Sequence, residues 1–203
     1  MKHAGSALLD RVGVSIPSHR LKEKTTHPVC LTPQSAILLA HSQGGQYGWI
    51  LADARPSKVK AIIAVEPIGP PFINAIFPPF TPARPYGLTE IPLTFSPPIH
   101  SATDLQTMIV SSSTNFTCIQ QTSPPRKLVN LANIPVLVVT SEAGYHSVYD
   151  TCSVDFLRRA GINVDHVRLS DVGIYGNGHL MFMEKNNLQI ADQVVRKWLN
   201  EAL

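Results

Sequence analysis

The residues with the clearest chemical meaning are Ala-His-Ser-Gln-Gly-Gly at positions 40–45, which place Ser42 between a short apolar run and a helix-compatible segment. A serine held at a tight strand-to-helix turn exposes its hydroxyl above the sheet, where it can act as a nucleophile. Strand and helix nearly collide at such a turn, so small residues are needed two places before and after the serine. Ala40 and Gly44 meet that need. The pattern predicts that Ser42 attacks a carbonyl group.

A serine nucleophile needs a base beside it and an acid that orients the base. His179 stands in a glycine-rich loop that follows the last predicted strand and precedes the last predicted helix. A loop at this place can reach back over the strand ends, so His179 is the predicted base. Of the other histidines after the serine, His100 is expected to be exposed and His166 to be structural, because they lie in a proline-rich segment and in a strand pattern.

Two glutamates are candidates for the acid, since each ends a predicted strand. Glu66 closes the strand that follows the elbow, and Glu142 closes the next strand of the series. Asp171 lies nearer to His179 in sequence but too early in its loop. Position alone favours Glu142, because the acid usually follows a later strand.

The elements that must position these side chains alternate between buried-type strands and amphipathic helices. This alternation predicts an α/β fold with a mostly parallel sheet and helices on both faces. Strands are predicted at 35–41, 59–65, 134–140 and 164–169, and helices at 45–54, 150–159 and 187–202.

The alternation is interrupted at about residues 67–130. Ten of the 17 prolines fall between Pro67 and Pro98, together with several aromatic residues. Proline blocks regular elements, whereas aromatic residues are scarce in disordered linkers. We therefore predict an ordered insertion that covers the site as a lid or cap.

Several segments, taken in order, resemble a family of bacterial and fungal α/β-hydrolases whose best-understood members are esterases. The resemblance covers roughly residues 4–13 and 35–203. The segments are AHSQGG at 40–45, VEPIGPPF at 65–72, RPYGLT at 84–89, SEAGYH at 141–146 and GNGHLMFMEKNN at 176–187. The resemblance implies the C-terminal part of an α/β-hydrolase that cleaves esters.

The resemblance also bears on the acid. In this esterase branch the acid is a glutamate that closes the strand after the elbow, 24 residues past the serine, and Glu66 has that separation from Ser42. It therefore implies Glu66 as the acid, with Glu142 as the alternative acid or as a pocket residue. The backbone N–H of Gln43, next to the nucleophile, is the predicted donor to the oxyanion.

The N-terminal part departs from the family pattern. Its members resemble one another over several further strands before the elbow, and one of the loops there supplies the second oxyanion donor. We therefore expect an N-terminally truncated member. Residues 1–34 would be a helix remnant at 4–13 and an irregular insert at 14–34, interpreted as translated intron, ahead of a hydrolase core at 35–203.

Composition argues against several classes of partner. The net charge is +3, and the dense basic patch at 19–24 lacks interleaved aromatic residues, which disfavours nucleic acid. No apolar run approaches the ~20 residues that span a bilayer. No signal peptide is visible, so the compartment is left open with the cytoplasm as the default. The oligomeric state is open as well.

Three widely spaced cysteines, Cys30, Cys118 and Cys152, fit neither a disulfide framework nor a metal site. They are predicted to be buried or incidental thiols. No metal and no organic cofactor is expected.

Together these features predict a serine hydrolase that cleaves a carboxylic ester or similar acyl bond of a small molecule through an acyl-enzyme. Ser42 is the nucleophile, His179 the base and Glu66 the acid. Two alternatives stay open. The chain could be a catalytically inactive fragment, or the fold could perform thioesterase, lyase or acyltransferase chemistry.

Overall fold

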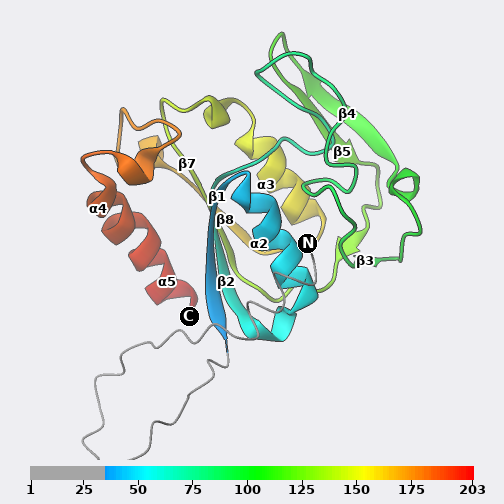
Figure 1. Cartoon of the computed structure of the whole chain (residues 1–203), viewed down its shortest axis with the longest axis horizontal. Helices are drawn as coiled ribbons and strands as arrows, with labels where there is room; N and C mark the ends of the chain where they lie inside the picture. The colour runs from blue at the N-terminus through cyan, green and yellow to red at the C-terminus, as the bar shows by residue number, and fades with distance from the viewer. Residues whose placement is uncertain (1–34) are drawn as a thin grey trace, which may run out of the picture.

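The computed structural model describes residues 35–203, which are built around a four-stranded parallel sheet (Figure 1). The order is β1-β2-β7-β8, and all three pairings are parallel. The strands are β1 (Ala36–Ser42), β2 (Val59–Pro67), β7 (Val136–Thr140) and β8 (Val164–Arg168). The predicted sheet is thereby confirmed, and its parallel strands all end at one edge. The helix predicted at 4–13 and the insert predicted at 14–34 lie outside the described residues.

Helices cover both faces of the sheet, because successive residues of a strand point to opposite sides. On one face, Ile62 and Ala64 of β2 share a buried core with the helices α2 (Gly44–Ala54) and α3 (Asp150–Arg159). These two helices lie side by side in front of the sheet in Figure 1. Both helices were predicted from the sequence.

The other face is covered by the C-terminal helix. It was predicted as a single helix, and it consists of α4 (Asn187–Ile190), a π-helical stretch η6 (Ala191–Arg196) and α5 (Lys197–Ala202). Its Trp198 packs in a second buried core with Ile63 of β2. The alternation along β2 thus divides the interior into two cores.

The segment between β2 and β7 forms two small antiparallel pairs. β3 (Phe95–Ser96) pairs with β6 (Lys127–Leu128), and β4 (Thr107–Ser112) pairs with β5 (Thr117–Gln121). The β4–β5 hairpin extends away from the sheet at the upper right of Figure 1.

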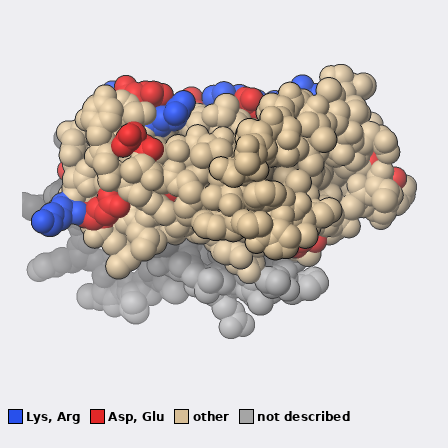
Figure 2. Space-filling model, turned by 90° about the horizontal axis from the view of Figure 1, so that it is seen from above, with Lys and Arg blue, Asp and Glu red and all other residues tan. Residues whose placement is uncertain are grey.

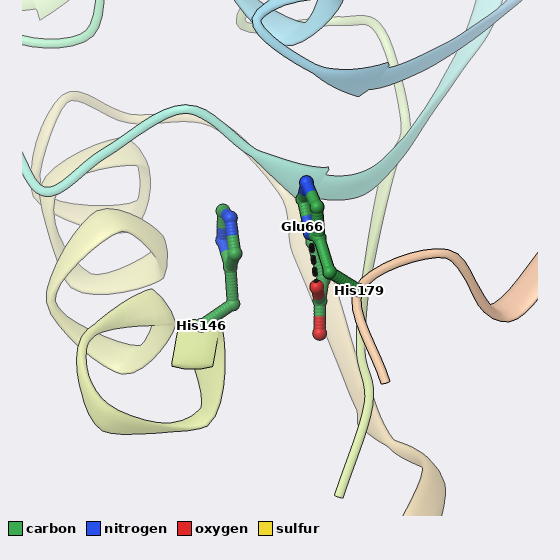
Figure 3. Close-up of side chains that lie close together, drawn as sticks. All are labelled: Glu66, His146 and His179. Carbon is green, nitrogen blue, oxygen red and sulfur yellow. Dashed lines mark hydrogen bonds and ion pairs between the residues drawn. The ribbon is translucent and has the colours of Figure 1, made fainter. Parts of the chain in front are cut away.

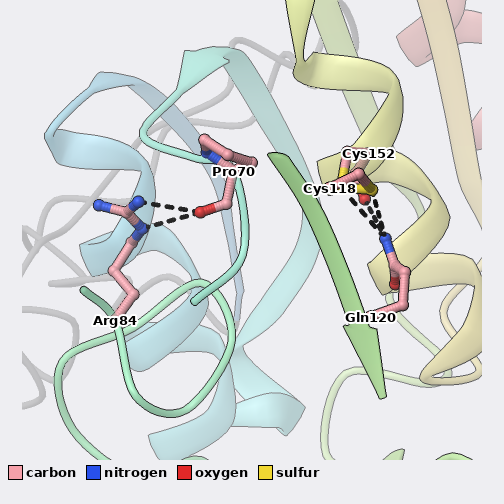
Figure 4. Close-up of a disulfide and its surroundings, with 5 residues drawn as sticks. All are labelled: Pro70, Arg84, Cys118, Gln120 and Cys152. Carbon is pink, nitrogen blue, oxygen red and sulfur yellow. Dashed lines mark hydrogen bonds between the residues drawn. A yellow bond between two sulfur atoms is a disulfide. The ribbon is translucent and has the colours of Figure 1, made fainter. Parts of the chain in front are cut away.

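This segment is ordered and partly buried, as the aromatic content predicts. Leu88, Leu93 and Phe95 belong to the first core. Arg84 is also buried, and its guanidinium donates to the backbone carbonyl of Pro70 from both Nε and Nη2 (Figure 4). The segment therefore helps to build the body of the molecule, and its function as a lid stays a prediction.

The prediction for the cysteines was wrong. Cys118 of β5 and Cys152 of α3 form a disulfide with their Cα atoms 5.8 Å apart (Figure 4). Gln120 lies beside the bridge and donates from Nε2 to the backbone carbonyl of Cys152. The two residues are 34 positions apart, so only the packing of β5 on α3 brings them together. Cys30 lies outside the described residues.

The outer side of β1 carries apolar groups that reach solvent. Within residues 35–203 its paired strand is β2, and Leu39 is 63% exposed. Next to it lies a groove of about 360 Å³ whose walls include Leu39, Val65, Val139 and Ile190. This groove runs between the sheet and the C-terminal helix.

Short 3-10 turns complete the described chain: η1 (Pro56–Lys58), η2 (Ala102–Asp104), η3 (Tyr145–Val148), η4 (Leu169–Val172) and η5 (Met181–Met183). None of the helices in the described part is both long enough and apolar enough to cross a bilayer. Figure 2 shows a largely uncharged face with Lys, Arg, Asp and Glu mainly along its rim.

Candidate active site

Ser42 is the last residue of β1, and its backbone has a φ of 54°. Such a left-handed conformation is uncommon for a residue other than glycine and marks a tight turn. A Cβ at Gly45 would come within 2.5 Å of the Pro67 Cβ, so this position has no room for a side chain. The steric requirement thus falls on Gly45 rather than on Gly44, where a Cβ would meet nothing within 4 Å. Ala40, the small residue before the serine, faces Gly48 of α2.

His179 lies in the loop between β8 and α4, and its imidazole joins two residues from other segments. Its Nδ1 is 2.6 Å from Glu66 Oε2, and its Nε2 is 3.0 Å from Ser42 Oγ. Because a carboxylate only accepts, Nδ1 donates to Glu66 and the Ser42 hydroxyl donates to Nε2. The structure therefore brings Ser42, His179 and Glu66 together in one hydrogen-bonded line.

The loop that carries His179 is fixed by its own polar contacts. Asn177 is buried and donates to Asn186 Oδ1 at 2.7 Å, while the backbone N–H of Gly178 donates to Glu184 Oε1 at 2.9 Å. His41 Nε2 is 2.8 Å from the backbone carbonyl of His179. These bonds hold the imidazole over the end of β1.

Glu66 is fully buried near the end of β2 and has a φ of 41°. Ser141, which follows β7, donates to Glu66 Oε1 from its backbone N–H at 2.9 Å and also from its hydroxyl. Gly144 packs against the same group, since a Cβ there would lie 2.7 Å from Oε1. Both carboxylate oxygens thus have donors, as a buried polar group requires.

The alternative acid lies elsewhere. Glu142 is exposed, and its Oε2 accepts from the backbone N–H of Gly176 at 3.0 Å. It supports the start of the loop that leads to His179. His100 is exposed, and His166 lies in β8 with its Nε2 2.9 Å from Thr140 Oγ1.

Gln43 begins the turn into α2 directly after Ser42. The first N–H groups of a helix have no acceptor within the helix and point outward from its start. The Gln43 N–H is therefore placed beside the nucleophile, where negative charge would develop on an attacked carbonyl. Its side chain accepts from Gln46 Nε2 at 3.4 Å.

A ring of aromatic side chains surrounds the imidazole of His179, and sequence reasoning missed it. His146 stacks on His179 with ring centroids 4.7 Å apart and an interplanar angle of 5°. Tyr145 and His41 contact the same ring at tilted angles, with centroids 4.9 and 4.5 Å away. The one available signal was the SEAGYH segment, whose resemblance was noted without a role for His146.

Burial shifts the pKa values of the groups near His179 toward their uncharged forms. Burial lowers the pKa of His146 from 6.5 to about 4 and also lowers the pKa of His41. It raises the pKa of Tyr145 and of Asp150. The carboxyl group that bonds to the His179 ring is that of Glu66, whose Oε2 lies 2.6 Å from Nδ1.

Glu66, His146 and His179 offer ligand atoms close enough together to suggest a metal site (Figure 3). The orientation of the rings argues against that use. His146 and His179 lie face to face, and each of their four nitrogens has a hydrogen-bond partner of its own. Ligand lone pairs must converge on one point to hold an ion, and stacked rings do not converge. The cluster fits acid–base chemistry better.

No family model matches the chain. The chain is 42% identical over 201 residues to the probable secreted lipase phiG of a fungal species (strain ATCC 74256). That match covers 98% of this chain and 49% of the lipase, so the chain spans about half the length of this curated relative.

The solved structures that a search finds include a bacterial esterase and mouse α/β-hydrolase domain-containing protein 10. The esterase has a TM-score of 0.49 and 23% identity, with 83% of this chain and 39% of the esterase covered. The mouse protein has a TM-score of 0.48 and 14% identity, with 100% of this chain and 69% of that protein covered.

The parallel sheet, the strand–serine–helix turn and the 42% identical relative together define the class. The chain belongs to the α/β-hydrolase family, in its esterase-like branch.

Proposed function

We propose that this chain is a serine hydrolase that cleaves carboxylic esters through an acyl-enzyme. The observation that carries the proposal is the line from Ser42 Oγ through the His179 imidazole to the Glu66 carboxylate, with separations of 3.0 and 2.6 Å. A hydroxyl, an imidazole and a carboxylate in this order form the arrangement that activates a serine for acyl transfer.

In the first half-reaction Ser42 Oγ adds to the ester carbonyl carbon, and His179 Nε2 takes the hydroxyl proton. Glu66 accepts the Nδ1 hydrogen bond and stabilises the imidazolium that forms. The Gln43 N–H donates to the oxyanion, an interaction that gains strength only as the charge develops. His179 then gives the proton to the departing alkoxide oxygen, and the acyl group stays on Ser42.

In the second half-reaction water attacks the acyl carbon, and His179 acts as the base again. The proton returns to Ser42 Oγ when the carboxylic acid leaves, so the enzyme is regenerated. The chain's own groups supply every proton transfer in this cycle. The name of the lipase relative supports an ester as the substrate.

The disulfide supports a secreted protein in place of the default cytoplasmic location. Disulfides such as Cys118–Cys152 persist in oxidising compartments and are rare in the cytosol. The 42% identical relative is named as a probable secreted protein. For this reason we propose that the chain reaches its folded state in the secretory pathway.

Labelling with a fluorophosphonate probe tests the proposed nucleophile. The purified 203-residue chain should label, whereas Ser42→Ala should not. Ser113→Ala is the matched control, because Ser113 is an exposed hairpin serine and its loss should leave labelling unchanged. A folded wild-type chain that stays unlabelled would contradict the proposal and favour a catalytically inactive product.

Product analysis separates ester hydrolysis from other chemistry of the same fold. Short-chain aryl esters should yield alcohol and acid with turnover that depends on Ser42. Faster cleavage of matched thioesters, or transfer of the acyl group to an added alcohol, would instead favour a thioesterase or an acyltransferase.

A further inference from the structure

His146 is buried directly against the predicted base, although it touches neither Ser42 nor Glu66 by a hydrogen bond in the structure. The side chain is 2% exposed, and its ring lies parallel to that of His179 (Figure 3). A flat, buried ring at 4.7 Å occupies the space into which the His179 imidazole would swing if it rotated about its side-chain bonds.

Both nitrogens of His146 are held by its own neighbours. Nδ1 is 3.0 Å from Asp150 Oδ1, and Nε2 is 3.0 Å from the hydroxyl of Tyr149. Asp150 is fixed in turn by the Thr140 hydroxyl, which donates to Oδ2 at 2.7 Å. The ring of His146 therefore cannot turn without breaking two buried hydrogen bonds, each of which is costly to leave unmade.

The titratable groups around His146 come from several elements. Tyr145, Tyr149 and Asp150 come from η3 and the start of α3, Glu66 comes from β2, and His179 comes from the loop after β8. Burial lowers the pKa of His146 to about 4, so its ring is neutral near pH 7. A neutral ring does not repel the imidazolium that His179 becomes during the proposed reaction.

We propose that His146 is a positioning residue for His179: its fixed ring holds the imidazole plane so that Nδ1 and Nε2 stay aimed at Glu66 and Ser42. This inference rests on the proposed function. The hydrogen bonds from His179 act along its ring plane, whereas the stack acts across it. Together they restrict the imidazole within its plane and on the side that His146 covers.

Two complementary substitutions separate positioning by the ring from simple structural support. His146→Phe keeps a flat ring but loses both hydrogen bonds, and His146→Asn keeps a polar group near Asp150 but loses the ring. The rate constant of fluorophosphonate labelling is measured across pH 5–9, per folded molecule. His166→Phe is the control, because His166 is a half-buried histidine that bonds to the same Thr140 and has no hydrogen bond or ring contact with His179 in the described structure.

Positioning by the ring predicts that His146→Phe labels within about threefold of wild type. His146→Asn should label ~10–100-fold more slowly, since a misplaced catalytic group costs about that much. Its pH profile should shift as well, because the environment of His179 changes. His166→Phe should match wild type. The reverse order, with Asn fast and Phe slow, or equal rates for the two variants, overturns the inference.

A second measurement does not depend on activity. In ¹⁵N-edited NMR of the imidazoles, His179 of the wild type should show one tautomer with Nδ1 protonated. His146→Asn should mix the tautomers, and His146→Phe should not. If the wild type fails to label, the proposed function falls, and this spectrum still decides the positioning role. Unchanged His179 signals in His146→Asn would refute it.

Discussion

In the described part of the chain, residues 35–203, two histidine–carboxylate pairs lie against each other. In one, His179 Nδ1 is 2.6 Å from Glu66, and in the other, His146 Nδ1 is 3.0 Å from Asp150. The pairs differ in what the second ring nitrogen meets. His179 faces the Ser42 hydroxyl and is 19% exposed, whereas His146 faces the Tyr149 hydroxyl and is 2% exposed.

The difference shows that residue type alone does not define a base. A serine hydroxyl that is open to solvent can give its proton to the imidazole and attack a substrate. Burial raises the pKa of Tyr149 and closes that possibility for the second pair. In the proposed mechanism the first pair transfers protons, and the proposed role of the second pair is to support it.

The pairs also differ in how the chain assembles them. His146 and Asp150 are four residues apart, since the turn η3 that holds His146 leads directly into α3, which begins at Asp150. Glu66 and His179 are 113 residues apart and meet only because β2 and the loop after β8 end at the same edge of the sheet. The first pair is a local feature, and the second depends on the whole fold.

Breaking the Glu66–His179 pair should have the largest effect on the rate of ester cleavage. Glu66→Gln should lower the rate of ester cleavage by ~10³–10⁴-fold, by the precedent of triads in which the acid was replaced by its amide. The amide can donate to His179 Nδ1 and so favours the wrong tautomer. Steady-state kinetics measures the loss, and unchanged circular dichroism excludes unfolding as its cause.

Removing the disulfide should loosen the helix that carries the His146–Asp150 pair, because Cys152 lies two residues after Asp150 in α3. Cys118→Ser should lower the free energy of unfolding by about 3–4 kcal/mol, since the bridge closes a loop of 34 residues. Urea unfolding with and without reductant measures this. Reductant should destabilise the wild type to the level of the variant and leave the variant unchanged. Labelling of the folded variant should fall less than in Glu66→Gln.

Lowering the pH should separate the two pairs by their effect on stability. The pKa of His146 is lowered from 6.5 to about 4, so the unfolded chain binds its proton more readily than the folded chain. Stability from His146 is thus present above pH 6.5 and is lost as the pH falls to about 4, by up to about 3 kcal/mol. The lowered pKa of His166 removes stability over the same pH range. The raised pKa of Asp150 has the opposite effect on stability as the pH falls.

His146→Phe removes this titrating group and should flatten the acid loss. The measurement is the free energy of unfolding at pH 7 and at pH 4.5 for wild type and variant. If both proteins lose the same amount between the two values, His146 is not buried as a neutral ring.

The smallest effect is expected at the alternative acid. Glu142→Gln should change the ester cleavage rate by less than about twofold and the stability by less than about 0.5 kcal/mol, because Glu142 is exposed and bonds only to a backbone N–H in the structure. It is also the matched control for Glu66→Gln. A large loss of activity in this variant would return Glu142 to the role of acid.

The sheet could be predicted from the sequence because its signals are local. Apolar strands and amphipathic helices alternate in segments such as 59–65 and 150–159, and the bounds found agree closely. The serine turn was recognisable for the same reason. The steric contact at Gly45 was misassigned to Gly44, because it depends on where Pro67 of another strand lies.

The choice between Glu66 and Glu142 as the acid could not be made from the sequence pattern alone. Position along the chain favoured Glu142, and the 24-residue separation favoured Glu66. The structure places Glu66 beside His179, but neither hydropathy nor spacing states how far a loop reaches back over a sheet. Its catalytic role stays a proposal that the substitution above tests.

The contacts that the sequence could not reveal are those between distant segments. The Cys118–Cys152 bridge needs β5 to pack on α3, and the Ser141 donors need β7 beside β2. His146 gave no pattern of its own, since a histidine followed by an aspartate four residues later is common on helices. Only packing turns it into a neighbour of His179.

The position of Ser42 at the end of β1 also has a kinetic consequence. Within the described residues β1 is bonded to β2 on one side, whereas β2 and β7 each lie between two strands. Strands with fewer partners open more often by local unfolding. The amides of β1 should therefore exchange with deuterium sooner than those of β7. The reactivity of Ser42 would then depend on the fraction of molecules in which β1 is hydrogen-bonded to β2.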